Sequence, residues 1–398
     1  LIGVNQVIMV CFSMAVISAF IGAKGLGFNL LLALNQLNIG LALEAGLCIS
    51  LIAILLDKMS LAWANKQTDY FGNLTFFERN KNTIFFGASV IIGIILAYVG
   101  TFIFKGGFNY LFEVPHNKGI STADFWNKGV DWIFDTFFVY IKAFNTWLIV
   151  DVLQPMRALY LRMPAVATLV LAVGAGYLIG GVRSALVVSA LTLFIALSPW
   201  WDRALVTLYM ATFGVVVSCL IGFTVGTICF QNKKSAAFML GICDIFQTFP
   251  SFVYLIPVMM LFGITDTSVL IAVVVYATIP ATRYTIEGLR SVPVGLHEAA
   301  TMSGVNKFQR LTKIEFPLAF PHMMLGLNQT IVFALFMVII GAFIGTEDLG
   351  QYILKALSDK NGAGIGLTLG ICVAFIGLIF DNLIRTWVNK RKKHLGIA

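Results

Sequence analysis

The sequence predicts an all-α fold, a polytopic transmembrane helical bundle of roughly ten spans. Hydrophobic residues make up 59% of the 398 residues, charged residues make up 12%, and the mean hydropathy is +0.90. A soluble chain of this composition would aggregate, so much of its apolar surface must face lipid. A helix needs about 20 mostly apolar residues to cross a membrane. The apolar windows that meet or approach this length are residues 4–22, 41–63, 83–104, 165–182, 184–199, 203–230, 236–262, 267–284, 325–345 and 363–388.

Basic residues between these windows fall on one side of the membrane if the windows alternate in direction. Cytoplasmic loops carry an excess of Lys and Arg, so this side, with the C-terminus, is predicted to be cytoplasmic. The net charge of +8 is then explained by membrane boundaries and anionic lipid headgroups, and no nucleic-acid partner is predicted. The basic groups are Lys58, Lys66, Arg79 and Lys81; Lys233 and Lys234; Arg283, Arg290, Lys307, Arg310 and Lys313; and Lys390 to Lys393.

The sequence offers no catalytic or metal-binding constellation. The six cysteines, at positions 11, 48, 219, 229, 243 and 372, lie in or beside apolar windows without metal-like spacing, so they are interpreted as small buried hydrophobes and no disulfide is predicted. Glu113, His116 and Asp124 are too scattered to bind a metal. The chain begins with Leu and shows no charged region before its first span, so no signal peptide is recognised. No cofactor is predicted.

The chain contains a long internal repeat. Residues 1–34 align with 324–357 without a gap, and after one inserted residue the alignment continues to residue 66. Generic membrane composition would match Leu, Ile and Val freely, but it would not align amide, acidic, Trp and Lys residues together. The long spacing indicates two fused domains rather than a solenoid. The matched pairs include Asn5 with Asn328, Gln6 with Gln329, Gly22 with Gly345, Asp57 with Asp381, Trp63 with Trp387 and Lys66 with Lys390.

A polar segment between two apolar windows is the most specific feature of the sequence. Pro293 and Pro317 bracket it, and each favours a helix boundary nearby. Small residues are expected on one side of a short helix there, where another surface could approach closely. With its basic residues, the segment is predicted to be a cytosolic docking helix. The small residues are Ala299, Ala300, Ser303 and Gly304.

The spacing of this segment resembles the EAA loop, the element that couples ABC importer permeases to their ATPases. The motif residues are Glu298, Ala299, Ala300, Gly304, Ile314 and Pro317. One position departs from the family pattern, Phe316 in place of the usual Leu, and the change keeps an apolar group. The resemblance implies a type I ABC importer permease fold. An ordinary amphipathic connector is the alternative explanation of the segment.

Longer segments narrow the resemblance to the glycine betaine/proline class of these permeases. They are CDIFQTFPSFVYLIPVMMLFGI from Cys243, NQTIVFALFMVIIGAFIG from Asn328, and GVNQVIMVCFSMAVISAFIGAKGLG in the first copy. The resemblance implies import of a compatible solute, a small zwitterion or cation, from a periplasmic substrate-binding protein. It also implies a separate cytosolic ABC ATPase dimer. No Gly-rich phosphate loop ending in Gly-Lys-Ser/Thr occurs here, so the chain is expected to be a transporter subunit and no ATPase.

The repeat and the resemblance together predict a tandem-fused permease that lacks the front of its first domain. Residues 1–66 would be the C-terminal remnant of a first permease domain, and 67–82 a cytosolic linker. Residues 83–164 would supply the first span and a periplasmic or interfacial segment of the second domain. Its core would be 165–390, with the coupling loop at 285–320, followed by a basic cytosolic tail at 391–398. This arrangement places the protein in the bacterial inner membrane as a multi-pass chain.

Several polar and aromatic residues inside apolar windows are candidates for a translocation path. Unpaired polar groups in hydrocarbon are costly, so they should pair or face water. Pro250 and Pro257 are expected to kink their helix and free carbonyl groups toward a cavity. Aromatic rings also attract quaternary ammonium groups. The alternative explanation is packing and interhelical hydrogen bonding. The candidate path residues are Asn5, Gln6, Asn328, Gln329, Gln247, Phe249 and Tyr254.

Three further segments receive structural predictions. The loops 25–38 and 348–362 carry a helical pattern and are expected to be interfacial helices. By resemblance they are the periplasmic scoops that contact the binding protein. Segment 105–163 carries aromatic residues on most faces with Asp131, Asp135 and Lys142 between them, which favours a helix in the headgroup region over a span.

Two other function classes compete with the importer permease. An ion-coupled secondary transporter of a small zwitterionic solute would need buried carboxylates near the middle of the membrane, and only Glu44 and Asp244 are candidates. A membrane enzyme is disfavoured because no His, Cys or Asp cluster is predicted. Within the leading class, the sequence leaves the solute open among glycine betaine, proline, other amino acids, choline-like amines, amine oxides and sulfonium osmolytes.

Overall fold

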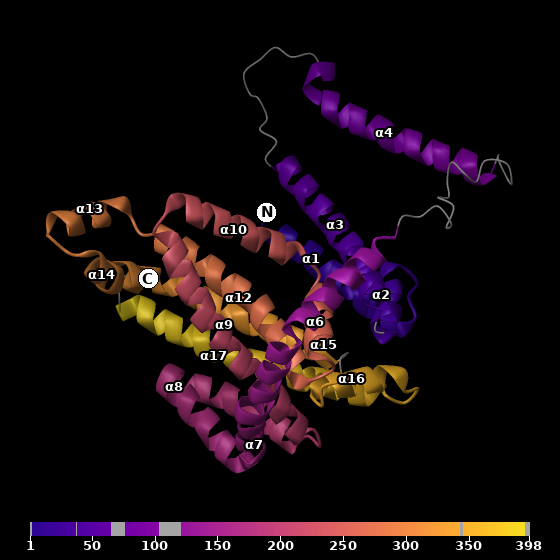
Figure 1. Cartoon of the computed structure of the whole chain (residues 1–398). Helices are drawn as coiled ribbons and strands as arrows, with labels where there is room; N and C mark the ends of the chain where they lie inside the picture. The colour runs from indigo at the N-terminus through magenta and orange to yellow at the C-terminus, as the bar shows by residue number, and fades with distance from the viewer. Residues whose placement is uncertain (1, 37, 65–75, 103–120, 343–344, 395–398) are drawn as a thin grey trace.

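The computed structural model describes residues 2–36, 38–64, 76–102, 121–342 and 345–394, and within these ranges all regular secondary structure is helical (Figure 1). Helices satisfy every backbone group internally, as a lipid environment requires. The first part comprises α1 (Ile2–Ile17), η1 (Ser18–Ile21), α2 (Leu26–Asn35), α3 (Ile39–Ala64), α4 (Phe76–Phe102), α6 (Ala123–Trp147), η3 (Leu148–Leu153) and α7 (Gln154–Leu161). The remainder comprises α8 (Ala165–Leu197), α9 (Trp201–Phe230), α10 (Lys233–Thr248), α11 (Phe252–Phe262), α12 (Asp266–Arg290), α13 (Val294–Met302), α14 (Lys307–Arg310), η4 (Leu311–Glu315), α15 (Phe316–Gly341), α16 (Leu349–Ser358) and α17 (Ala363–His394).

The fold class is confirmed, whereas the span count is lower than expected. In the described residues, 7 helices are long and apolar enough to cross a membrane, or up to 8 if the bent pair α10–α11 is one span. The window at 4–22 became α1, which is 16 residues long, followed by η1. The window at 83–104 lies in α4, whose apolar part is the shorter stretch Ile84–Leu96. Residues 76–82, expected in the linker, form the first turns of α4.

The two windows at 165–182 and 184–199 belong to α8, which folds back on itself. Gly181, with φ 71° and ψ −161°, interrupts the helix. A Cβ on Gly176 would lie 2.9 Å from Cα of Ala185. Nine residues of straight helix would separate these positions by about 13 Å, so the arms are antiparallel. At the tip, Lys390 Nζ donates to the Leu178 carbonyl oxygen over 3.4 Å.

The predicted kink at Pro250 is present. Helices α10 and α11 are bent by 92° across residues 249–251, while Pro257 lies within α11 without ending it. The break brings the chain next to the first copy, because Ser251 Oγ lies 3.4 Å from Ser13 Oγ of α1. The helix pair therefore forms a broken span or a re-entrant loop.

Residues 123–161, part of the segment 105–163 predicted to be interfacial, are helical as expected. They form one helical stretch of 39 residues, α6–η3–α7, which meets the length and hydropathy required of a span. Its aromatic residues are largely exposed, including Trp132 at 65% and Tyr140 at 75%. The earlier part of the segment lies outside the described residues.

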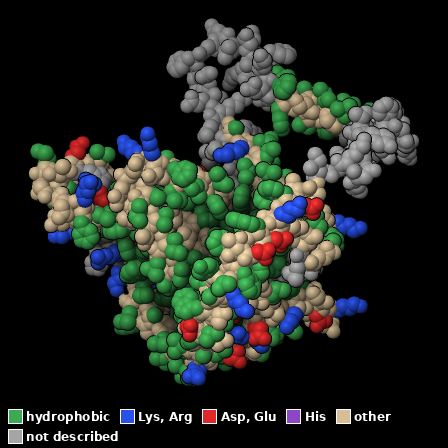
Figure 2. All heavy atoms as spheres, viewed as in Figure 1, with side chains coloured by type: hydrophobic (Ala, Val, Ile, Leu, Met, Phe, Trp, Pro, Cys, Tyr) green, Lys and Arg blue, Asp and Glu red, His purple; other side chains and the backbone are tan. Residues whose placement is uncertain are grey.

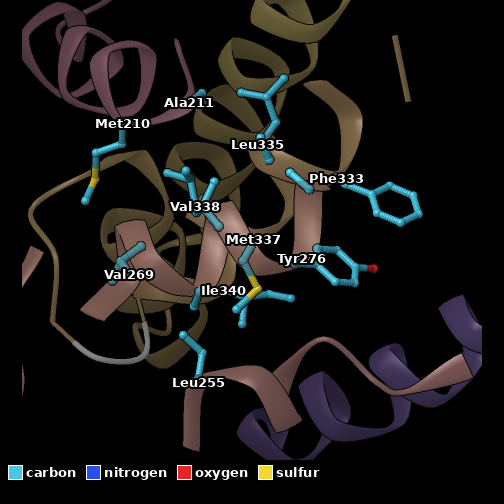
Figure 3. Packing of buried hydrophobic residues seen from close by; sticks show 14 of the residues in the cluster. Met210, Ala211, Leu255, Val269, Tyr276, Phe333, Leu335, Met337, Val338 and Ile340 are labelled. Atoms are coloured by element: carbon cyan, nitrogen blue, oxygen red, sulfur yellow. The ribbon is translucent and has the colours of Figure 1, made fainter. Parts of the chain in front are cut away.

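Helices α9, α12 and α15 form the centre of the bundle (Figure 3). Small residues let α9 and α12 approach closely, as is common between membrane helices. A Cβ on Gly222 would lie 2.5 Å from Ala281 Cβ and 3.0 Å from the Thr282 amide nitrogen. An interhelical hydrogen bond from Ser218 Oγ to the Val274 carbonyl oxygen, at 3.2 Å, adds to this contact. The space around this core is filled by Met210, Leu255, Val269, Tyr276, Phe333, Met337 and Ile340.

The two repeated segments adopt the same order of helices. In the first copy η1 and α2 follow α1, and in the second α16 follows α15. Gly22 and Gly345, which the alignment pairs, both have left-handed backbones, with φ 90° and φ 92°. Their amides donate to the matched carbonyl oxygens of Ala19 and Ala342 at 3.1 and 2.9 Å. The repeat is therefore present in the backbone as well as in the sequence.

The two ends of the bundle differ in what they carry (Figure 1). Helices α13 and α14 lie at the same end as the C-terminal part of α17, while α2 and α16 lie at the opposite end. Contacts agree with this arrangement: the Phe320 and Trp387 ring centroids are 5.1 Å apart, which joins the start of α15 to the end of α17. Hydrophobic side chains are exposed over much of the face shown in Figure 2, as expected for helices that contact lipid.

Candidate functional site

The polar segment that the sequence predicts to be a docking helix forms α13 and a tight turn. Pro293 precedes the helix as its N-cap, and Gly304 ends the turn with φ +73°. The Val305 and Gly304 amides donate to the Ala300 and Thr301 carbonyl oxygens, both at 3.1 Å, which is the Schellman pattern. A Cβ on Gly304 would meet nothing within 4 Å. Gly304 is therefore required by its backbone conformation, not by crowding inside this chain.

The second half of the loop is built into the following helix. Asn306 Oδ1 accepts from the Gln309 amide at 2.8 Å, and Gln309 Oε1 accepts from the Asn306 amide at 3.1 Å, a capping box. From there the chain stays helical through η4 into α15, so Pro317 lies in the first turn of α15 rather than ending a helix. Ile314 and Pro317 are half-buried. The loop is thus fixed to the membrane bundle at both ends.

The outward side of α13 exposes apolar groups around Glu298. Val294, Glu298 and Met302 are spaced by four residues, so they lie on one side of the helix. Val294 is 69% exposed, Met302 89%, and Phe308 on α14 73%. We call Val294, Glu298, Met302 and Phe308 the coupling patch. Ala299 is exposed, but Ala300 is buried, so the small-residue side predicted to meet a partner is turned partly toward the protein itself.

The predicted path residues near the α10–α11 break are held by contacts within the bundle. Arg283 of α12 donates to Gln247 Oε1 at 2.8 Å and to Asp244 Oδ1 at 2.6 Å. Asp244 therefore pairs with Arg283, not with the Lys233–Lys234 loop. The Tyr254 hydroxyl donates to the Phe246 carbonyl oxygen. Phe249 is partly buried.

Aromatic rings near this break form a continuous series that includes three residues outside the predicted path set, Phe246, Tyr276 and Phe333. The Tyr254 and Tyr276 centroids are 5.3 Å apart, and Tyr276 stacks on Phe333 at 4.7 Å. In Figure 3 the Tyr276 and Phe333 rings lie on the same side of α12 and α15. Each belongs to a long apolar window, so only the tertiary structure brings them together with Tyr254. Phe246 and Phe249 continue the series at 5.9 Å.

The amides at the start of the repeated helices are not shown to share one site. Asn328 Nδ2 donates to Asp381 Oδ1 of α17 at 2.9 Å, and Asp381 also pairs with Arg385 at 2.6 Å. Gln329 is partly buried. Asn5 and Gln6 belong to α1, but their side chains lie outside the described residues. Interhelical bonding therefore accounts for the position of Asn328.

A second cluster of charges lies at the end of the bundle opposite the coupling patch. Glu347, in the turn between α15 and α16, accepts from Arg157 of α7 at 2.9 Å and Arg203 of α9 at 3.1 Å. These hydrogen bonds hold the pKa of the Glu347 carboxyl below its ordinary value. Asp266 Oδ2 lies 3.7 Å from Arg157 and accepts from the Tyr209 hydroxyl at 3.0 Å. Arg157 and Asp266 line a cavity of about 200 Å³. The sequence offered no local signal for this cluster.

Asp348 carries a pH-sensitive charge next to this cluster. Its side chain is fully buried and caps α16 by accepting from the Gln351 amide at 3.1 Å. Burial raises the pKa of the Asp348 carboxyl from its ordinary value of 3.8 to about 7. A raised carboxyl pKa means that the folded state favours the protonated form. The stability gained is present below the ordinary pKa and is lost as the pH rises through about 7.

We predict that Asp348→Asn reduces the loss of thermal stability between about pH 5 and pH 8. Asn keeps a side-chain oxygen that can accept from the Gln351 amide, and it removes the carboxylate. The ionised carboxylate lowers the stability of the folded state by at most about 4 kcal/mol. The check is the melting midpoint of the purified permease across this pH range. Asp359→Asn is the matched control, because Asp359 is exposed and caps only the Asn361 amide at 3.0 Å. Equal pH dependence in wild type and Asp348→Asn would contradict the prediction.

Other chemistry finds no support in the described part of the chain. No group of three or more His, Cys, Asp or Glu residues there could hold a metal ion. All six cysteines are free; Cys219, Cys243 and Cys372 are buried as expected, whereas Cys11 and Cys48 are exposed on helices α1 and α3. Glu44, considered for ion coupling, accepts from the Ser121 hydroxyl at 2.8 Å in an exposed position near the start of α3. The site to explain is therefore the coupling patch, the α10–α11 break and the charge cluster at the opposite end.

Comparisons with known proteins agree with this geometry. Residues 214–394 match the family described as binding-protein-dependent transport system inner membrane component. The chain is 88% identical over 398 residues to the trimethylamine N-oxide transport system permease protein TmoV of Pelagibacter ubique, covering all of this chain and 56% of that protein. It is 40% identical over 413 residues to TmoV of Ruegeria pomeroyi, covering 59% of that protein.

A more distant relative is covered more fully. The glycine betaine/proline betaine transport system permease protein ProW of Escherichia coli is 30% identical over 271 residues, which is 68% of this chain and 76% of ProW. The chain spans less than two thirds of the length of the two TmoV proteins. With the family match, the ProW similarity and the all-helical bundle, the chain belongs to the binding-protein-dependent transport system inner membrane component family of ABC importer permeases.

Proposed function

We propose that this chain forms the larger part of the membrane permease of an ATP-driven importer for a small methylated solute. Trimethylamine N-oxide is the preferred substrate in this proposal, ahead of glycine betaine. The observation that carries the proposal is the similarity at 88% identity, over the whole chain, to a permease named for trimethylamine N-oxide transport. Amine oxides were one of the solute classes that the sequence left open. The betaine-type permeases are similar at lower identity, 30% for ProW.

In this proposal the coupling patch docks into a cytosolic ABC ATPase dimer. Three apolar side chains that lie outside the membrane bundle, at 69–89% exposure, need a partner surface to leave water. The coupling-patch end would be cytoplasmic. It carries Arg290, Lys307 and Lys313, and the basic residues at the end of α17 lie beside it.

The opposite end, with α2 and α16, would receive a periplasmic binding protein. The two helices hold matched positions in the repeat, so they would present related surfaces to the two lobes of one partner. This arrangement requires the pseudo-twofold axis that two fused permease domains provide. The division of the chain into a remnant at 1–66, a linker at 67–82 and a second domain at 83–390 stays part of the proposal.

A hydrolysis assay tests the ATPase partnership. The purified permease alone should hydrolyse no ATP, and the complex with its ATPase subunit should hydrolyse ATP faster when solute-loaded binding protein is added. Hydrolysis by the permease alone would contradict the assignment. A competition experiment in the same system ranks the solutes. Unlabelled trimethylamine N-oxide should inhibit the uptake of a labelled solute at a lower concentration than unlabelled glycine betaine does. The reverse order would assign the betaine class instead.

The ion-coupled alternative gains no support from the two carboxylates considered for it. Asp244 pairs with Arg283 at 2.6 Å and is 56% exposed at its side chain, and Glu44 bonds to Ser121 at the end opposite the coupling patch. A coupling acid would instead be expected to be buried and to change partners near the middle of the membrane.

A further inference from the structure

The turn before α16 is tied to the bundle by two arginines from different helices. Arg157 Nη2 of α7 donates to Glu347 Oε2 at 2.9 Å. Arg203 Nη1 of α9 donates to the same oxygen at 3.1 Å and to the Glu347 backbone carbonyl at 3.2 Å. We call Arg157, Arg203 and Glu347 the outer latch. Moving the turn away from α7 and α9 requires all three contacts to break.

Helix α9 also holds the first residues of α16. The Leu349 amide donates to Thr207 Oγ1 at 3.1 Å, one turn after Arg203. The Arg203 guanidinium lies 4.9 Å from the Tyr352 ring centroid, a cation–π contact. Arg203 therefore contacts both the turn and the helix that follows it, so α16 and the turn are expected to move together.

The first copy carries different residues in the turn before its matched helix, α2. Gly22 and Gly345 have nearly equal φ angles, but the two turns then differ, since Gly25 has φ 152° and the matched Asp348 has φ −100°. Two positions later the first copy has Lys24 where the second has Glu347, and then Gly25 where the second has Asp348. At the position of Tyr352 it has Asn29. Lys24 could not take the place of Glu347 between two arginines because like charges repel, and within the described residues it makes no ion pair, whereas Glu347 makes two.

We propose that α16 is a gate that opens and closes the transport path at this end of the second copy, and that the outer latch holds it closed. Helix α2, at the matched position of the first copy, would be a gate without this restraint. The two halves of the permease would then open asymmetrically. Glu347 is 58% exposed at its side chain, so water and a docking protein can reach the ion pairs. Exposed pairs are individually weak, which suits a contact that must break in each cycle. This inference rests on the proposed function, because α16 can act as a gate only if the chain transports a solute.

The test is ATP hydrolysis by the full-length permease in complex with its ATPase, without binding protein. If ATP binding favours the open gate, weakening the closed state raises basal hydrolysis. Glu347→Gln should raise it by about threefold to tenfold, the range expected for losing two exposed pairs. Lys24→Gln, at the matched position of the first copy, should leave it unchanged. Raising the salt concentration should increase wild-type hydrolysis but not that of Glu347→Gln.

A double-mutant cycle separates a latch from a general loss of structure. Arg157→Gln combined with Glu347→Gln should be no more active than Glu347→Gln alone, because the only contact of Arg157 in the latch, with the Glu347 carboxylate, is already lost. Misfolding would lower hydrolysis in each variant instead. If the wild-type complex fails to hydrolyse ATP, the proposed function is wrong. If the wild type hydrolyses ATP and Glu347→Gln equals it, falls below it, or is matched by Lys24→Gln, the latch is wrong.

Discussion

Met302→Glu in the coupling patch is expected to reduce solute uptake at least about tenfold while leaving the permease folded. The Met302 side chain is 89% exposed, so it contributes little to the stability of this chain. In a complex it would be buried in the ATPase, and an unpaired carboxylate there costs several kcal/mol. Met302→Leu keeps an apolar group of similar volume and should transport nearly as well as wild type. The measurement is uptake by proteoliposomes with matched amounts of assembled complex.

Gly304 extends this test to the shape of the loop. Gly304→Leu places a branched side chain at φ +73°, which strains the turn by roughly 1–2 kcal/mol and adds bulk beside the coupling patch. Gly304→Asn tolerates the left-handed conformation and should keep more activity. If Met302→Glu and Gly304→Leu both transport like wild type, the segment is a connector without a coupling role.

Gly222→Val should cause a large loss of stability in the bundle. Any Cβ at this position would lie 2.5 Å from Ala281 Cβ and 3.0 Å from the Thr282 amide nitrogen, and the backbone atom cannot move without displacing α12. Overpacking of this kind costs about 1–3 kcal/mol, and more where the backbone is involved. We expect a clear fall in the melting midpoint of the detergent-purified permease and reduced yield of folded protein.

Gly241→Val is the matched control for this change. A Cβ on Gly241 would meet nothing within 4 Å, although the residue also lies inside a helix, α10. Valine has a higher helix propensity than glycine, so Gly241→Val should not lower the melting midpoint. Equal melting midpoints for Gly222→Val and Gly241→Val would show that α9 and α12 do not pack as closely as described.

The sequence predicted those parts of the fold that depend on local composition. Apolar windows became helices, Pro250 marked the break between α10 and α11, and the LGQYILKAL pattern became α16. Hydrophobic length and proline geometry act within a few residues, so a single sequence contains them. The interfacial position of 105–163 stays a prediction, because the length and composition of the helix at 123–161 also suit a span.

Contacts between distant residues could not be predicted in the same way. Arg157, Arg203 and Glu347 stand far apart in the chain and meet only because α7, α9 and the α15–α16 turn pack together. Asn328 illustrates the same limit: its sequence position allowed both a path and an interhelical bond, and the contact with Asp381 depends on how α15 and α17 are rotated. The role of the path residues stays a prediction.

The most direct test of the account is uptake of labelled trimethylamine N-oxide by proteoliposomes that contain the full permease, its ATPase and its binding protein. With ATP supplied on the side of the coupling patch and ionophores collapsing every ion gradient, uptake should continue, and it should stop when ATP is replaced by a non-hydrolysable analogue. Uptake that ionophores abolish and ATP does not support would contradict the assignment of this chain to an ATP-driven importer.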